Sequence, residues 1–160
     1  YVLDYFKDKT DVVMECRYLF QYAGKNNAVE LPTEYELKEI NKELLMKIHG
    51  TIVPSLFWNE NSNFLERGKG YCISRGDDIA SWAFSAAVST KEIDIGIETN
   101  PNYKKKGLGM IVASKMIRYT LEQGKYPVWA CHCKNIASEK MAESLGFVKE
   151  DECTIIKVAN

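Results

Sequence analysis

A junction between a strand and a helix constrains the fold of this chain more than any other segment. The junction runs from Thr99 to Gly109 and reads TNPNYKKKGLG. Before it, Ile93, Ile95 and Ile97 alternate with other residues, the period of two that is typical of a strand with unlike faces. After it, apolar residues recur at helical spacing as far as Gly124 and Pro127: Leu108, Ile111, Val112, Met116 and Tyr119. We therefore predict that a strand ends near Thr99 and a helix begins near Leu108.

The loop inside this junction has the chemistry of a phosphate site. Gly107 and Gly109 remove side chains where the backbone must bend and let a ligand approach, and the amides of a first helical turn attract anions. A run of lysines adds positive charge: Lys104, Lys105 and Lys106. An ordinary solvated turn would also explain the loop taken alone. The chain lacks a P-loop and the third glycine of a dinucleotide fingerprint, which disfavours nucleotide hydrolases and dehydrogenases.

A second motif follows the helix after the junction, and the two motifs together are more specific for one family than the loop alone. A short apolar run, 128–131, precedes Asn135, which is a good N-cap for a helix that closes at Gly146 and Phe147. The order of elements and motifs is a strand, a P-x-Y-[basic]-x-[basic]-G-x-G loop, a helix, a second strand, and then an N-x-x-[small] motif whose helix ends in L-G-F. This order resembles the GNAT superfamily of acetyl-CoA-dependent N-acetyltransferases. The resemblance covers about 71–158. The WACH segment after the Gly-Lys-Tyr-Pro turn is most similar to a bacterial subgroup that includes zwittermicin-resistance acetyltransferases.

The resemblance implies an α/β (α+β) fold: a mixed, mostly antiparallel twisted sheet with helices on both faces. The residues upstream agree with it. We predict a hairpin over 71–88 with its turn at Arg75–Asp78, and a third strand over 91–99. A capping box at Thr33–Glu36 predicts a helix that ends near Gly50, and 54–67 is compatible with a second, shorter helix.

We divide the chain into an amino-terminal strand segment, 1–30, and a GNAT-like domain, 31–160. Alternating residues predict a strand of about ten residues around 13–22, which we expect to pair with something ahead of residue 1. The chain begins at a tyrosine, so the segment is consistent with the remnant of a longer protein.

The resemblance also implies how a cofactor would bind. In the family an irregular strand end hydrogen-bonds the pantetheine of acetyl-CoA or coenzyme A, and loop amides wrap the pyrophosphate. At the strand end the matching residues are Ile97, Glu98 and Thr99, and Asn135 would reach the pantetheine arm. The loop positions are Lys104, Lys105, Lys106, Gly107, Leu108, Gly109 and Met110.

The usual catalytic residues are absent. Many relatives carry a tyrosine seven residues after the motif asparagine, where this chain has Ala142, and some carry a glutamate five residues before it, where this chain has Ala130. The candidate bases are then Glu92 and Asp94, which lie two apart on the cofactor strand and can both face an acceptor cleft. A solvated strand face explains these two carboxylates equally well. The reserve candidates are Glu98 and His132.

Composition narrows the class of protein. A chain of 160 residues can form one domain with a full core, and a net charge of −1 disfavours nucleic acid as a partner. Nothing in this sequence resembles a signal peptide or an apolar run of membrane-spanning length, so we expect a cytoplasmic protein without a membrane partner. Five cysteines without a small-domain spacing pattern predict reduced thiols.

Two clusters with histidine invite a catalytic interpretation. Cys131, His132 and Cys133 lack a second ligand pair, so we expect no metal; a catalytic cysteine with His132 as its base is an alternative to small buried thiols beside Trp129. His49, near the end of its expected helix, suits a partner of the helix dipole.

Two functions remain. The first is an enzyme that moves an acetyl group from acetyl-CoA to a primary amine of a small molecule by direct transfer; the resemblance leaves a homodimer open. The second is a non-catalytic coenzyme A-binding sensor or regulatory module of a longer protein, which the missing tyrosine and glutamate would favour.

Overall fold

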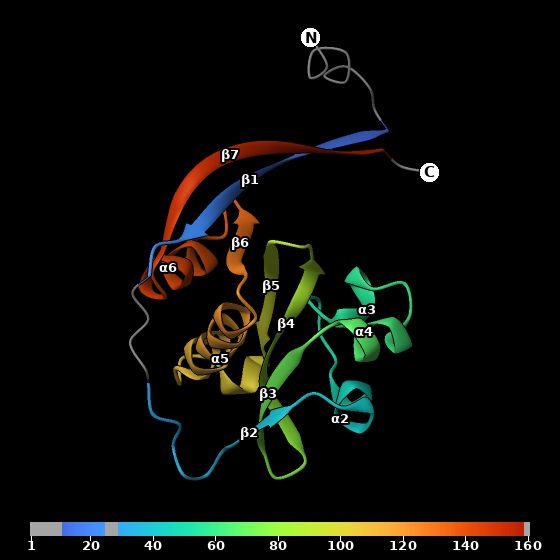
Figure 1. The fold of residues 1–160 in the computed structure, drawn as a ribbon, viewed down its shortest axis with the longest axis vertical. Coiled ribbons are helices and arrows are strands. Elements are labelled where there is room, and N and C mark those ends of the chain that lie inside the picture. Colours follow the sequence, from blue (N-terminus) through green and yellow to red (C-terminus); the bar gives the residue numbers. More distant parts are fainter. Residues whose placement is uncertain (1–10, 25–28, 159–160) are drawn as a thin grey trace.

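One mixed sheet organises the molecule. The computed structural model describes residues 11–24 and 29–158. Its seven strands lie in the order β2-β3-β4-β5-β6-β1-β7, and every neighbouring pair is antiparallel except β5 and β6, which are parallel (Figure 1). The strands are β1 Val12–Tyr22, β2 Glu36–Glu39, β3 Gly70–Arg75, β4 Asp78–Val88, β5 Glu92–Thr99, β6 Tyr126–His132 and β7 Phe147–Val158.

Helices cover both faces of this sheet (Figure 1). On one face, α5 (Leu108–Glu122) packs across β3 to β6, and α6 (Ile136–Ser144) packs on β6 and β7. On the other face lie α2 (Lys42–Lys47), α3 (Pro54–Phe57) and α4 (Asn61–Arg67). Each face has its own buried cluster, one around Met116 and Trp129 and the other around Trp82 and Phe84. The predicted fold class is therefore confirmed. No helix in the described ranges is long and apolar enough to cross a bilayer.

The prediction of a helix that starts at the capping box of Thr33 is wrong for its first part. Residues Glu36–Glu39 form β2 instead, an edge strand paired with Tyr71–Ser74 of β3. Hydrogen bonds to the backbone edge of β3 stabilise this segment as a strand more than its local propensity stabilises a helix. Tertiary contacts often outweigh local propensity in this way. The helix begins later, at Lys42, where the side chain of Asn41 accepts a hydrogen bond from the amide of Leu44 at 2.9 Å.

The other upstream predictions are confirmed with one refinement. The hairpin of β3 and β4 turns at Gly76, whose φ of 60° lies in the left-handed region, and β5 follows as the third strand. The segment 54–67 forms two helices rather than one, because α3 ends at Phe57 and α4 begins only at Asn61. The indole of Trp58 donates to the carbonyl of Ser85 at 2.8 Å, which ties this break to the sheet.

The predicted amino-terminal strand is present as β1, but its expected pairing is wrong. Both of its neighbours follow it in the sequence: Arg17–Gln21 pairs with β6, and the whole strand pairs with β7. The other parts of segment 1–30, residues 1–10 and 25–28, lie outside the described residues. The structure thus places β1 inside the sheet, where its side chains can reach the site described below.

The parallel pair β5 and β6 creates the opening in the sheet. Their registered pairs run from Glu92 and Tyr126 to Asp94 and Val128, and beyond this point the strands separate. The start of α5 and the start of α6 both face the gap, since these helices follow directly on the loop after β5 and the turn after β6. Separated parallel strands leave backbone groups that a ligand can bind.

Candidate active site

A cavity of about 490 Å³ lies at this opening, between the end of β5, the loop before α5, and α6. The structure brings to it every residue that the family resemblance implies for the cofactor. These are Ile97, Glu98, Thr99, Lys104, Lys105, Lys106, Gly107, Leu108, Gly109, Met110 and Asn135. Four further lining residues were not predicted: Tyr103, Ala137, Ser138 and Met141.

The backbone of the loop is shaped to bind an anion. Lys105 and Gly107 both have left-handed backbones, with φ of 61° and 75°. Gly107 is the N-cap of α5 and carries no side chain to cap the helix, so the amides of its first turn face the cavity without a side-chain acceptor. Successive amides in such a bend form a concave anion-binding surface. The three lysines nearby are exposed and add positive charge.

Gly109 lets α5 approach the end of β5 closely. A Cβ atom at this position would stand 3.1 Å from the Thr99 hydroxyl oxygen and 3.1 Å from the terminal carbon of Met141. The loop is held from behind by Tyr103, whose hydroxyl donates to Asp78 at 2.9 Å. The cavity wall is therefore built by backbone and small side chains, which suits a long ligand that lies against the main chain.

The end of β5 is anchored on both sides. The Thr99 and Ser81 hydroxyls are hydrogen-bonded at 2.8 Å. The carboxylate of Glu98 accepts from the amides of Thr51 and Ile52 at 2.8 and 2.7 Å, so it holds the 50–52 loop on the opposite face. Glu98 thus contributes backbone to the cavity, while its side chain, a reserve candidate for the base, is already engaged.

A second cavity of about 240 Å³ adjoins the first. The two share three lining residues: Ile97, Asn135 and Ser138. Asp94 of β5 and Arg17 of β1 both line the second cavity. Burial raises the pKa of the Asp94 carboxyl, and the positive charge of Arg17 partly opposes that shift. Sequence reasoning missed Arg17, because nothing local in β1 shows that the strand lies beside β6.

Glu92 does not share this cavity with Asp94. It lies at the start of β5, exposed, beside a separate hollow that Tyr126 and Pro127 also line. The period of two does put both residues on one face of the strand, but Glu92 lies about 7 Å from Asp94 along β5, at the paired end of β5 and β6. The expected common position of the two carboxylates is therefore not found.

The meeting point of the two cavities is organised by the turn that begins α6. Asn135 is the N-cap, as predicted, and its side chain accepts from the amide of Ser138 at 3.1 Å. The indole of Trp129 donates to the Ser138 hydroxyl oxygen at 3.1 Å. Ser138 was not singled out from the sequence, although the spacing of Asn135 and a small residue three positions later marks it as part of the cap. His132 lines the second cavity, and its Nδ1 accepts from the amide of Lys134 at 3.1 Å.

The cysteines differ from the prediction of reduced thiols. Cys16 of β1 and Cys133 form a disulfide across Cα atoms 5.5 Å apart, so the prediction is wrong for this pair. The carboxylate of Glu152 lies near the pair, but sulfur atoms joined to each other do not offer a metal the thiolates it needs. Cys131 is buried and burial raises its pKa, which favours the inert buried thiol over a catalytic cysteine.

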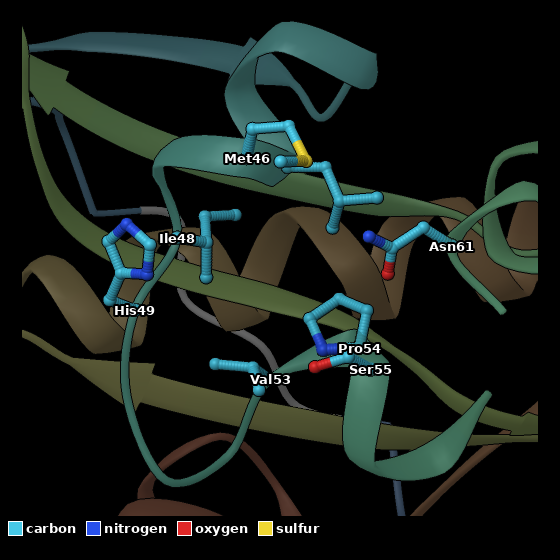
Figure 2. Close-up of a pocket in the computed structure, with 8 residues that line it drawn as sticks. Met46, Ile48, His49, Val53, Pro54, Ser55 and Asn61 are labelled. Atoms are coloured by element: carbon cyan, nitrogen blue, oxygen red, sulfur yellow. The ribbon is translucent and has the colours of Figure 1, made fainter. Parts of the chain in front are cut away.

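His49 belongs to a different part of the molecule. It follows the end of α2 and lines a cavity of about 160 Å³ on the face opposite α5, with Val53, Pro54 and Asn61 (Figure 2). None of the residues that line this cavity also lines either cavity at the strand opening. His49 is therefore separate from the candidate site.

Comparison with known proteins agrees with this geometry. The family model of the GNAT acetyltransferases matches residues 5–156. The uncharacterized N-acetyltransferase YdfB of Bacillus subtilis is 28% identical over 153 residues, which is 93% of this chain and 58% of YdfB. The chain thus spans less than two thirds of the length of this curated relative.

Solved structures share the fold. A GCN5-related N-acetyltransferase-like protein from Streptococcus suis superposes with a TM-score of 0.79 at 23% identity, covering 98% of this chain and 66% of that one. AAC(6')-Iy, solved with the bisubstrate analogue CoA-S-monomethyl-acetylneamine, has a TM-score of 0.61 at 14% identity, covering 74% of this chain and 94% of that one. The match of the family model over nearly the whole chain shows that this protein belongs to the GNAT acetyltransferase family.

Proposed function

We propose that this chain transfers an acetyl group from acetyl-CoA directly to a primary amine of a small molecule. The observation that carries the proposal is the junction of the two cavities at Ile97, Asn135 and Ser138. One cavity ends in an anion-binding loop and the other contains a half-buried carboxylate. A thioester in the first would therefore lie within reach of an amine in the second.

The first cavity fits the cofactor that the family uses. When bound, acetyl-CoA supplies an activated acetyl group on a thiol that is a good leaving group. The amides of Gly107 to Met110 would bind the pyrophosphate, with charge-assisted bonds that are each worth roughly 1.5–3 kcal/mol. The separated backbone of Ile97 to Thr99 would bind the pantetheine arm as a strand binds its neighbour, and Asn135 would lie beside it.

Asp94 is the candidate base. An amine reaches the enzyme as an ammonium ion and must lose a proton before its nitrogen can attack. A carboxylate whose pKa is raised by burial is a better proton acceptor than an exposed one. Asp94 lines the second cavity, where the amine would bind and which is therefore the proposed acceptor cavity, whereas Glu92 does not line it.

The departing thiolate needs a donor in place of the missing tyrosine. The Ser138 hydroxyl lies where the two cavities meet, and its oxygen accepts from the Trp129 indole. Its O–H, which interacts with the buried Cys131 thiol, would turn to the departing sulfur. Ser138 would donate a hydrogen bond to the thiolate as the C–S bond breaks.

The non-catalytic alternative is not favoured. A coenzyme A sensor requires the first cavity, but it does not require a second one with a half-buried carboxylate at the thioester end. Membership of an acetyltransferase family also favours the enzyme over the sensor.

Binding of the cofactor is tested by thermal denaturation. A ligand at 100 times its Kd stabilises the folded state by about 2.7 kcal/mol, which raises the Tm of a chain of this size by roughly 5–11 °C. Gly107→Val should abolish the shift, because a β-branched residue strains the left-handed backbone and obstructs the approaching phosphate. Gly124→Val is the matched control: Gly124 has a similar φ of 68° at the other end of α5, so this variant is destabilised but still responds to acetyl-CoA.

Catalysis is tested by release of coenzyme A thiol from acetyl-CoA with a library of amines. Asp94→Asn should lower turnover by about 10²–10⁴ and leave acetyl-CoA affinity nearly unchanged, while Glu92→Gln should keep full activity. An unaltered Tm of the parent protein at millimolar acetyl-CoA would refute the cofactor assignment. Binding without thiol release for any amine would favour the sensor.

A further inference from the structure

The second cavity is lined by two opposite charges that do not form a close ion pair with each other. Arg17 from β1 and Asp94 from β5 both line it, with β6 between their strands. Neither side chain belongs to any of the ion pairs within 4.0 Å that join residues of the described ranges. A cavity with separated positive and negative groups is complementary to a molecule that carries both charges itself.

Arg17 is placed to bind an anionic group. One guanidinium nitrogen donates to the carbonyl of Ala130 at 3.4 Å, which leaves other N–H groups of its planar fork available. The nearby Glu15 is already paired with Lys157 at 2.8 Å. Within the described ranges no carboxylate lies within 4.0 Å of this half-buried guanidinium, so its burial removes water without supplying an ion pair there. An anion that enters the cavity would supply that pair.

The remaining walls limit the size and character of the ligand. Ile52, Phe57 and Ala86 provide an apolar side. At about 240 Å³ the cavity is smaller than the roughly 300–1,000 Å³ typical of sites for drug-sized ligands. The positive charge of Arg17 also opposes a second ammonium group, which disfavours polyamines and other polycationic acceptors.

We propose that the acceptor is a small amino acid or a close analogue, whose carboxylate binds Arg17 while its ammonium group faces Asp94. This inference rests on the proposed acetyltransferase function and names its substrate class. The nitrogen attacks the acetyl carbonyl carbon, an N–C bond forms and the C–S bond breaks. Of the two protons that the ammonium group loses, one passes through Asp94 to solvent and the other goes to the thiolate. The products are an N-acetylamino acid and coenzyme A.

The test compares amino acids with the amines that result from removing their carboxylate, such as alanine with ethylamine and leucine with 3-methylbutylamine. The readout is kcat/KM from coenzyme A release. We expect the parent protein to prefer the amino acid by about 10- to 100-fold in each pair, the range that one charge-assisted contact supplies. Spermidine serves as the polycationic competitor and should react poorly.

Variants of Arg17 then assign the preference to this residue. Arg17→Gln should lower kcat/KM for the amino acid by about 10- to 100-fold, mainly through KM, so that the ratio of kcat/KM for the amino acid to kcat/KM for the simple amine falls towards one. Arg17→Lys keeps the charge without the fork and should lie between the two. Arg118→Gln, an exposed arginine on α5, is the control and should behave like the parent.

The outcomes separate this inference from the proposed function. If simple amines or spermidine react as well as amino acids in the parent protein, the amino acid proposal is wrong and the acetyltransferase function stands. If acetyl-CoA binds but no amine of either kind releases thiol, both are wrong. If Arg17→Gln fails to fold, the comparison of substrates in the parent protein decides the matter without it.

Discussion

Removing the Glu98 carboxylate should loosen the loop that covers the acceptor cavity. Glu98 accepts hydrogen bonds from the amides of Thr51 and Ile52 at 2.8 and 2.7 Å and from the Thr51 hydroxyl at 3.2 Å. Ile52 lines the acceptor cavity, and its carbonyl accepts from the Trp82 indole at 2.8 Å. Gly50 completes the contact, because a Cβ atom there would collide with the Glu98 carboxylate and the Trp82 ring. Glu98→Ala therefore removes one of two anchors of this loop.

The magnitude follows from the number and setting of these bonds. Two backbone amides bound to a carboxylate would contribute roughly 3–6 kcal/mol if they were shielded from water, but Glu98 is only half-buried. Water can reach the loop and replace part of this, so we expect the free energy of unfolding to fall by about 2 kcal/mol. For a chain of this length that is a loss in Tm of about 4–8 °C. Because Ile52 is also displaced, KM for the amine should rise several-fold while acetyl-CoA affinity stays the same.

The assay is thermal denaturation with and without acetyl-CoA, followed by amine kinetics. Glu98→Gln is the matched variant, since its amide oxygen can accept from both backbone amides and its NH₂ group can donate to the Thr51 hydroxyl. It should lose less than half of what Glu98→Ala loses. The reasoning is refuted if Glu98→Ala keeps the parent Tm, or if its Tm falls while KM for the amine does not change.

Three further predictions concern charge and the disulfide. Burial raises the pKa of Asp94 in the folded state above its unfolded value, so the folded protein loses stability as the pH rises through that interval. Asp94→Asn should therefore be more stable than the parent at neutral pH, and pH-dependent denaturation should show this gain vanishing below about 3.9, the pKa of an ordinary aspartate. Neutralising Lys104 and Lys106 should weaken coenzyme A more than dephospho-coenzyme A in calorimetric titrations if the lysines reach the ribose phosphate; equal losses would assign them to the pyrophosphate, and no loss would make them solvated charges. The disulfide of Cys16 and Cys133 closes a separation of 117 residues, so reduction should lower the free energy of unfolding by about 2–4 kcal/mol in the parent, and a variant with serine at both positions should not respond to the reductant.

The lining of the cavity that we propose for the cofactor could be predicted almost completely from the sequence and its resemblance to the family. Its parts are local: a strand period, a left-handed glycine at Gly107, a glycine at Gly109 where a helix meets a strand, and the N-cap Asn135. Each of these is decided by the backbone within a few residues, so the pattern and the structure agree.

The acceptor cavity could be predicted only in part. Asp94 and Glu92 were both candidates for the base, but only Asp94 lines this cavity. The reason is that β5 and β6 separate only after the pair of Asp94 and Val128, so Glu92 stays in the paired part of the strands. Arg17 and Ser138 were missed. Arg17 reaches the cavity because β1 inserts between β6 and β7, a placement that the sequence of β1 does not encode locally.

The sequence by itself determined the local elements of this protein and the chemistry of its loop, because glycine conformation, helix caps and hydrophobic periodicity act over a few residues. Tertiary structure alone decided that Glu36–Glu39 is a strand, that β1 lies beside β6, and that Cys16 meets Cys133. These outcomes depend on which distant backbone edge is free to pair and which face can be buried, so they are settled by the whole sheet. The charges that we propose to select the acceptor, Arg17 and Asp94, come together for the same reason.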